Sequence, residues 1–232
     1  MMSIRRSEDR GVARLAWLDS RHSFSFGHYF DPDHMGFRDL RVINDDTVAP
    51  GAGFDTHPHR DMEIVTYPLS GGIAHKDTLG NETVVRAGEI QRMSAGTGIL
   101  HSEFNASETD PVNFLQIWIL PEREGLPPGY EQIAVPDDEK RDSLRLVAAR
   151  DGRDGALTVH QDVEIYASIL TPGTTLSHRL RDGRHAWLHL ARGSATVNGA
   201  EIAAGDGVAF GDVDVIEITA GEEAELLLFD LV

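Results

Sequence analysis

The sequence contains no cysteine, and acidic residues far outnumber basic ones, 38 against 21. Without cysteine there is neither a disulfide framework nor a thiolate ligand, so any metal ion has to be held by nitrogen and oxygen atoms. The formal net charge of −17 excludes a general nucleic-acid surface and argues against attachment to an anionic membrane. Both of those functions depend on clustered Lys and Arg side chains.

Long apolar runs and long amphipathic helices are also lacking. No stretch approaches the length that spans a bilayer, and residues 1–11 are charged, without the apolar core of a signal peptide. We therefore expect a cytoplasmic protein that binds neither membranes nor nucleic acid directly.

Short runs rich in Val, Ile, Leu and aromatic residues recur along the whole chain. They end at Gly, Asp, Asn or Pro, as strands do, and no segment has a helical period with caps at both ends. Examples lie at residues 40–43, 63–69, 114–120, 144–147, 186–190 and 224–231. The pattern predicts an all-β fold with few short helices.

The two halves of the sequence resemble each other weakly. Residues 84–90 are similar to residues 201–207, and each segment follows a hairpin signal. A Pro-rich, charged stretch at residues 121–142 separates the halves. Self-similarity at this spacing predicts two tandem copies of one β-barrel, of the jelly-roll type.

Two short motifs carry the chemistry. His57-Pro58-His59 and His101-Ser102-Glu103 each place two side chains on one face of a strand, because side chains at i and i+2 point the same way. If the strands face each other inside a barrel, three imidazoles and a carboxylate converge on one ion. An isolated HxH pair is weak evidence for a metal site, but the combination with HxE favours one. Strand parity also places Glu63 on this face, so Glu63 and Glu103 both remain candidates for the carboxylate ligand.

The two segments resemble the paired motifs of the cupin superfamily. The first is similar to G(X)5HXH(X)3E, with Gly51, His57, His59 and Glu63. The second is similar to G(X)5PXG followed by H(X)3N, with Gly88, Gly96, His101 and Asn105. It departs from that pattern at Ser94, which stands in the proline position, and by four residues instead of two between Gly96 and His101.

More specifically, the chain resembles bacterial members of the pirin family. The similar strings lie at residues 17–26, 40–46, 57–63 and 93–98. The resemblance implies a bicupin, with a metal-binding N-terminal cupin at residues 1–130, a linker at 131–143, and a degenerate C-terminal cupin without metal ligands at 144–232. It also implies that Glu103 rather than Glu63 completes a metal site with His57, His59 and His101.

The function implied by the resemblance is that of a quercetin 2,3-dioxygenase. A divalent metal, Fe²⁺ in the first place and otherwise Mn, Co, Ni, Cu or Zn, would be used to cleave a flavonol with O2 and release CO. Glu103 would act as the general base. One alternative is a regulatory or redox-sensing protein that acts through a protein partner, since a mammalian pirin is a nuclear transcriptional cofactor. Another is a cupin isomerase or other enzyme that does not use oxygen.

Several other residues are lesser candidates. Phe114, Gln116 and Trp118 share one strand face and could line the cavity, whereas His75 and Asp77 beside a turn are expected to be solvated or to stabilise a hairpin. Two further sets of histidines are not expected to bind metal: one in a Phe-rich stretch that could cover the barrel mouth, and one too irregularly spaced for a second site. They are His22, His28 and His34, and His178, His185 and His189.

Overall fold

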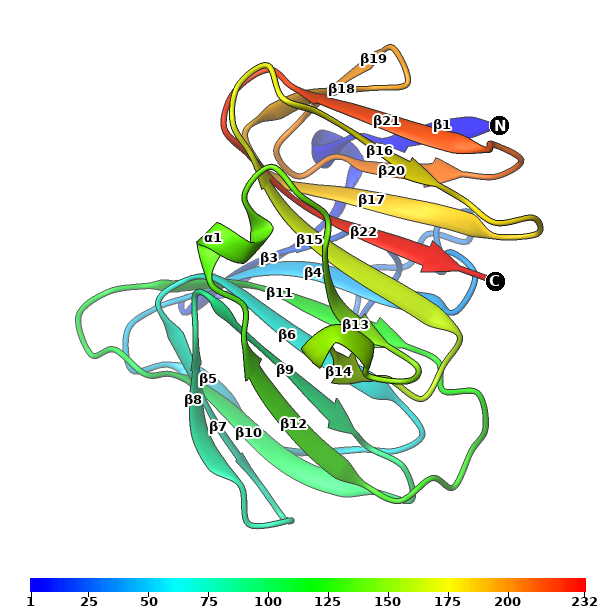
Figure 1. Ribbon diagram of the computed structural model, residues 1–232. Helices are drawn as coiled ribbons and strands as arrows, with labels where there is room; N and C mark the ends of the chain where they lie inside the picture. Colours follow the sequence, from blue (N-terminus) through cyan, green and yellow to red (C-terminus); the bar gives the residue numbers. More distant parts are fainter. The chain divides into compact units, whose positions relative to one another are not determined.

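The computed structural model describes residues 1–232 and consists almost entirely of β-strands (Figure 1). This confirms the all-β prediction. Helix is limited to α1 (Asp137–Lys140) and to 3-10 turns at Ser7–Asp9 and Arg153–Gly155. No helix reaches the length and apolar character that crossing a membrane requires.

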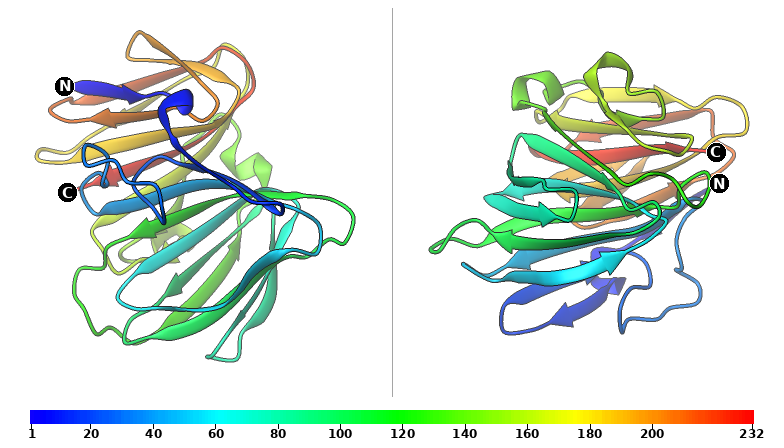
Figure 2. Two further views of the ribbon diagram at one scale, coloured as in Figure 1. Left: turned by 180° about the vertical axis from the view of Figure 1, so that it is seen from behind. Right: turned by 90° about the horizontal axis from the view of Figure 1, so that it is seen from below.

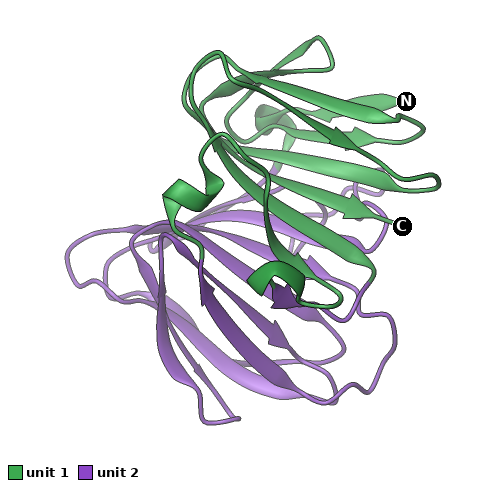
Figure 3. Ribbon diagram, in the orientation of Figure 1, with its two compact units in different colours: residues 1–10, 135–156, 162–232 green, residues 11–134, 157–161 purple.

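The chain divides into two compact units (Figure 3). Unit 1 comprises Met1–Arg10, Val135–Ala156 and Asp162–Val232, and unit 2 comprises Gly11–Ala134 and Leu157–Gln161. A short segment from each half of the sequence thus belongs to the unit formed mainly by the other half. The predicted boundaries, with a linker at 131–143, stay a prediction.

Unit 2 contains two antiparallel sheets, whose strands curve around a common interior (Figures 1 and 2). The smaller sheet has the order β5-β10-β7-β8, with β5 Gly53–His59, β10 Ile99–Asn105, β7 Gly72–Asp77 and β8 Glu82–Arg86. The larger has the order β12-β9-β6-β11-β4-β3-β2, with β12 Gly129–Ala134, β9 Glu89–Ser94, β6 Glu63–Ser70, β11 Val112–Ile119, β4 Leu40–Val48, β3 Leu18–His22 and β2 Gly11–Arg14.

Unit 1 repeats this strand order. Its smaller sheet is β16-β21-β18-β19, with β16 Thr175–Arg179, β21 Val215–Ala220, β18 Ser194–Val197 and β19 Ala200–Ala203. Its larger sheet contains the order β1-β20-β17-β22-β15-β13, with β1 Met2–Arg5, β20 Gly207–Phe210, β17 His185–Arg192, β22 Ala224–Leu231, β15 Val163–Leu170 and β13 Arg145–Ala149. The remaining strand, β14 (Leu157–Thr158), lies in the segment that belongs to unit 2.

The weak sequence repeat marks the same hairpin in both units. Residues 84–90 run from β8 into β9, and residues 201–207 run from β19 into β20. The turns contain Gly88 and Gly205, with φ of 85° and 88°. Residues that carry a side chain rarely adopt this backbone conformation. The same turn in both units therefore requires glycine at the same position. The predicted internal repeat is confirmed.

The interiors of the two units differ in chemistry. Unit 1 has an extended apolar core of Leu, Ile, Val, Ala and Phe side chains from both sheets, and a small cluster around Leu146. Unit 2 has smaller apolar clusters, one around Phe114 and one around Met93. Its interior also buries polar side chains that hydrogen-bond from one sheet to the other, among them Glu103 of β10 and Gln116 of β11.

Candidate metal centre

Three histidines converge where β5 pairs with β10. The antiparallel register places His101 opposite His57 and Ile99 opposite His59. The ring centroids lie 4.5 Å apart for His57 and His101, 4.7 Å for His57 and His59, and 4.8 Å for His59 and His101. One ring nitrogen from each histidine lies within 4.8 Å of the other two, which is a spacing that a single ion can bridge.

The orientation of His57 directs a lone pair toward this cluster. Its Nδ1 donates a hydrogen bond to the Asp55 carbonyl oxygen at 2.7 Å, so Nε2 of the neutral ring is an acceptor. That Nε2 lies 3.0 Å from Nε2 of His101. A backbone carbonyl that fixes the tautomer in this way is a common feature of metal-binding histidines.

The electrostatics of the cluster favour neutral imidazole. Burial, followed by the neighbouring His57, lowers the pKa of His59 to about 4. Burial and the other histidines lower the pKa of His101 to about 2. Neutral imidazole is the form that ligates a cation, so these side chains fit a divalent ion without prior loss of a proton.

Glu103 is buried, and three side chains hold its carboxylate. Gln116 donates from Nε2 to Oε2 at 2.7 Å, while Thr66 Oγ1 and Gln91 Nε2 lie 3.3 and 3.4 Å from Oε1. Burial raises its pKa to about 7, although the hydrogen bonds from Thr66 and Gln116 oppose this shift. Near neutral pH the Glu103 carboxyl can therefore both accept and release a proton.

The four predicted ligands are divided between two overlapping groups, one of which also contains His75. His57, His59 and His101 form the first group, while His75, His101 and Glu103 form the second, again with ligand atoms within 4.8 Å of one another. His101 belongs to both. The structure thus brings the three histidines together and places Glu103 beside the shared one; its role as the fourth ligand stays a prediction.

His75 was not expected at this centre. Its side chain is buried, lies opposite Glu103 in the β7–β10 register, and packs with its ring 5.3 Å from that of His101. Its Nε2 is 3.0 Å from Asp77 Oδ2. The expectation of solvated side chains is wrong, because β7 turns His75 and Asp77 to the same buried face as Ile73. The alternation with Ala74 and Lys76 was the sequence signal for this.

The other expected role, at the hairpin, is confirmed for Asp77. Its Oδ1 accepts hydrogen bonds from the backbone N–H groups of Leu79 and Asn81 at 2.8 and 3.1 Å. Asp77 therefore closes the β7–β8 turn while its other carboxylate oxygen holds His75. The turn and the buried ring are tied together by one side chain.

Glu63 makes its contacts elsewhere. Its Oε2 accepts hydrogen bonds from Ser94 Oγ at 2.9 Å and from the backbone N–H of His160 at 3.2 Å. The parity argument that placed it beside the histidines is wrong, because β5 ends at His59 and β6 begins at Glu63. Between them Asp61 has a φ of 48°, which interrupts the strand alternation.

Aromatic side chains cover the histidines on one side. The Trp118 ring meets His59 edge-on, with centroids 5.0 Å apart, and Phe26 packs against Trp118 at 5.2 Å. Phe114 is buried in the neighbouring apolar cluster. The prediction that one or more of Phe114, Gln116 and Trp118 line the interior is confirmed, with Gln116 bound to Glu103 and Trp118 beside His59.

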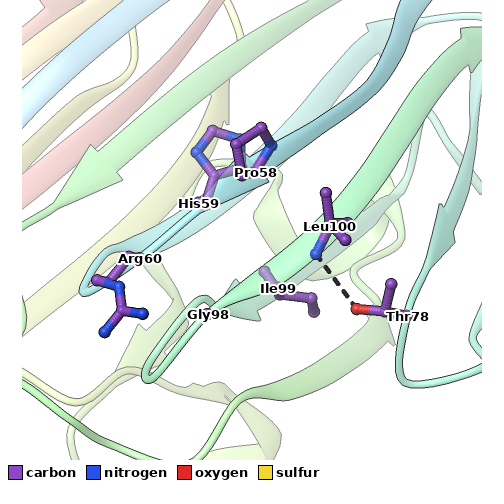
Figure 4. Close-up of a pocket in the computed structure, with 7 residues that line it drawn as sticks. All are labelled: Pro58, His59, Arg60, Thr78, Gly98, Ile99 and Leu100. Atoms are coloured by element: carbon purple, nitrogen blue, oxygen red, sulfur yellow. Dashed lines mark hydrogen bonds between the residues drawn. The ribbon is translucent and has the colours of Figure 1, made fainter.

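A cavity of about 560 Å³ opens beside His59 (Figure 4). Residues at the end of β5 and the start of β10 line it, together with Thr78, whose hydroxyl accepts a hydrogen bond from the Leu100 N–H at 3.2 Å. Pro58, Ile99 and Leu100 make its wall largely apolar. The cavity has the size of a small-molecule site and reaches one of the three histidines.

Three of the other histidines make contacts away from this centre. His22 Nδ1 lies 2.7 Å from Asn44 Oδ1, His34 pairs with Asp31 at 2.8 Å, and His178 pairs with Asp230 at 2.8 Å. Both groups of potential metal ligands lie in unit 2.

Two barrels of one topology, with three converging imidazoles in the first, define a metal-binding type of bicupin. The family model described as Pirin matches residues 4–119, and the one described as Quercetinase C-terminal cupin domain matches residues 146–231. The chain belongs to the pirin family. The predicted resemblance is confirmed.

Individual relatives are similar over the whole length. A protein of Escherichia coli (strain K12) named quercetin 2,3-dioxygenase is 47% identical over 231 residues, covering 100% of this chain and 99% of that protein. The crystal structure of the bacterial pirin YhhW from Escherichia coli in complex with nickel(II) is 47% identical, with a TM-score of 0.95 and coverage of 100% and 99%. A quercetin 2,3-dioxygenase structure from Acinetobacter baumannii, 20% identical, shares the fold, with a TM-score of 0.75 and coverage of 95% and 84%. The predicted enzyme class, an oxidoreductase of the dioxygenase type, is confirmed by the name of the E. coli protein that is 47% identical.

Proposed function

We propose that the protein is a metal-dependent dioxygenase that cleaves flavonols such as quercetin with O2 and releases CO. The observation that carries the proposal is the cluster of three imidazoles beside a buried carboxyl and an accessible cavity. The 47% identity to a protein named quercetin 2,3-dioxygenase supports the choice of reaction.

His57, His59, His101 and Glu103 would hold the ion. Imidazole and carboxylate donors suit Fe²⁺, which we favour, and also Mn, Co, Ni, Cu and Zn. The E. coli relative holds nickel(II), and ions late in the first transition row generally bind such donors more tightly than Fe²⁺ does. The bound ion would supply Lewis-acid activation of the flavonol hydroxyl and a site for O2.

Glu103 takes the proton from the 3-hydroxyl group of the flavonol. In the metal-free protein burial raises the pKa of Glu103 to about 7, so its carboxyl takes up and releases a proton near neutral pH. Gln116 holds Oε2 at 2.7 Å, which fixes the carboxylate while Oε1 keeps two longer contacts. Trp118 shields the histidines from water on one side. The products of flavonol and O2 are a depside and one molecule of CO, which balances the atoms.

The test is aerobic turnover of quercetin by metal-free protein reloaded with single divalent metals, with oxygen uptake and CO measured together. Equal consumption of quercetin and O2, with stoichiometric CO, is expected for at least one metal. His101→Ala should abolish turnover and metal retention, while the matched change His34→Ala, at a histidine paired with Asp31, should not. Metal binding without oxygen-dependent loss of quercetin would contradict the proposal and favour the regulatory alternative. Anaerobic activity would favour a non-oxygen enzyme.

A further inference from the structure

A second cavity of unit 2, about 350 Å³ in volume, lies along β3 and β4. Its polar wall consists of Ser20, His22, Asn44 and Asp46, all buried, and its apolar wall includes Phe26 and Phe54. Buried polar groups on one side of an otherwise apolar cavity are typical of sites that orient a small molecule.

Asp46 is the unusual member of this wall. Its side chain is only 3% exposed, yet Oδ1 has no hydrogen-bond partner. The neighbouring polar groups are engaged with one another, since His22 Nδ1 lies 2.7 Å from Asn44 Oδ1. A buried oxygen without a partner costs stability, and Asp46 lines the cavity, so a bound group that supplied the hydrogen bond would remove this cost.

The Asp46 carboxyl can bind both hydrogen-bond donors and acceptors, depending on its protonation. Burial raises its pKa to about 7, and the charges of Asp45 and Glu103 raise it further, against a hydrogen bond from Ser20. The carboxyl can thus accept a hydrogen bond or, when protonated, donate one. A phenolic hydroxyl is a matching partner, because it can do both.

Neighbouring residues place this cavity near the metal centre. Asn44 of the cavity wall lies opposite Gln116 in the β4–β11 register, and Gln116 donates a hydrogen bond to Glu103. On the aromatic side, Phe26 of the cavity wall packs against Trp118, which packs against His59.

We propose that this cavity receives a hydroxyl-bearing aromatic ring of the substrate, and that the Asp46 carboxyl hydrogen-bonds a ring hydroxyl. The inference rests on the proposed function, since it names the part of a flavonol that lies away from the reacting ring. A volume of about 350 Å³ is at the small end of ligand sites, as suits one ring with its substituents. Asp46 is then a specificity residue and takes no part in bond cleavage.

The test compares three flavonols whose pendant rings carry two hydroxyls, one and none: quercetin, kaempferol and galangin. Dissociation constants are measured anaerobically by fluorescence quenching of the metal-loaded protein, and kcat/KM is measured in air. Asp46→Leu should weaken quercetin binding roughly tenfold to a hundredfold and raise KM rather than lower kcat, because a hydrogen bond to the substrate is lost. Galangin should be affected less than about twofold.

Two variants serve as controls. Asp46→Asn keeps hydrogen-bonding capacity and should retain most of the preference for quercetin. Asp45→Leu makes the same change one position along β4, outside the cavity lining, and should not alter the order of affinities. Circular dichroism and thermal melting establish that each variant is folded.

Equal losses for all three flavonols, or none for any, in a folded Asp46→Leu protein would overturn the inference. This failure differs from failure of the proposed function. A wild-type protein that binds quercetin better than galangin through Asp46 but consumes neither would refute the dioxygenase and keep the subsite. Oxygen-dependent turnover of quercetin that is unchanged in the Asp46→Leu protein would refute the subsite and keep the dioxygenase.

Discussion

Replacing Glu103 by Gln should stabilise the metal-free protein near neutral pH. Burial raises the Glu103 pKa from 4.5 to about 7 in the native state, which disfavours the charged form. Below pH 4.5 both native and unfolded states are protonated, so the residue adds no pH dependence. As the pH rises toward 7 the unfolded state loses its proton while the native state keeps it, and native stability falls by about 3 kcal/mol. Above that pH the loss stays constant.

The Glu103→Gln variant, which cannot ionise at this position, lacks this loss. Its amide can match the Gln116 donor with its oxygen but then turns an N–H toward Gln91, so about 1 kcal/mol of the gain is lost again. We expect a net stabilisation of about 2 kcal/mol at pH 7 and, because the amide mismatch does not depend on pH, a net destabilisation of about 1 kcal/mol at pH 4.5. Asp46, whose pKa burial also raises to about 7, leaves a residual slope in both proteins.

The assay is urea unfolding of chelator-treated protein across this pH range, followed by the same series with a saturating divalent metal. Metal should reverse the order, because the ionised carboxylate then gains a cation that the amide binds less well. Identical pH slopes in the two metal-free proteins would refute the burial argument. A variant that stays more stable with metal present would refute Glu103 as a ligand.

Three further substitutions separate the roles of neighbouring residues. Glu63→Gln should lower the free energy of unfolding by about 1–3 kcal/mol, because it weakens the hydrogen bonds from Ser94 and from the His160 N–H. Elemental analysis should find the metal content unchanged. Loss of metal from folded protein would make Glu63 a ligand. His75→Phe should retain one metal per chain if His75 only packs beside the centre, and a metal-free protein of normal thermal stability would assign it a ligand role. Gly53→Ala places a methyl group 2.3 Å from the Glu103 carbonyl oxygen, so it should push β5 away from β10. Titration should then show metal affinity at least tenfold weaker. Unchanged affinity would contradict the close approach of the two strands.

The features that the sequence predicted well depend on residues that are close together in the chain. The HxH and HxE motifs lie within single strands, where alternation alone puts His57 with His59 and His101 with Glu103 on shared faces. The repeat was visible because a turn glycine with positive φ constrains the residue type in both units.

What the sequence did not predict depends on backbone irregularity and on pairing between strands. Counting by two from His59 to Glu63 crosses Asp61, where the chain leaves the β conformation, so the count selects the wrong face. His75 approaches Glu103 because β7 pairs with β10 in one register, which no local pattern encodes. The orphaned oxygen of Asp46 is likewise a property of the packed cavity.

Unit 1 is a control, within the same chain, for the stability that the buried polar side chains of the metal centre cost unit 2. In unit 1 the strand that corresponds to β10 is β21, and its inward residues Ile216 and Ile218 are fully buried in an apolar core. In unit 2 the corresponding strand buries His101 and Glu103, which cost stability until a ligand satisfies them. Removing metal should therefore increase hydrogen exchange in β5 and β10 and leave β16 and β21 unchanged, as read by mass spectrometry. Equal increases in hydrogen exchange in both units would mean that the ion stabilises the whole chain. The buried side chains of β10 would then not be the reason for its stabilising effect.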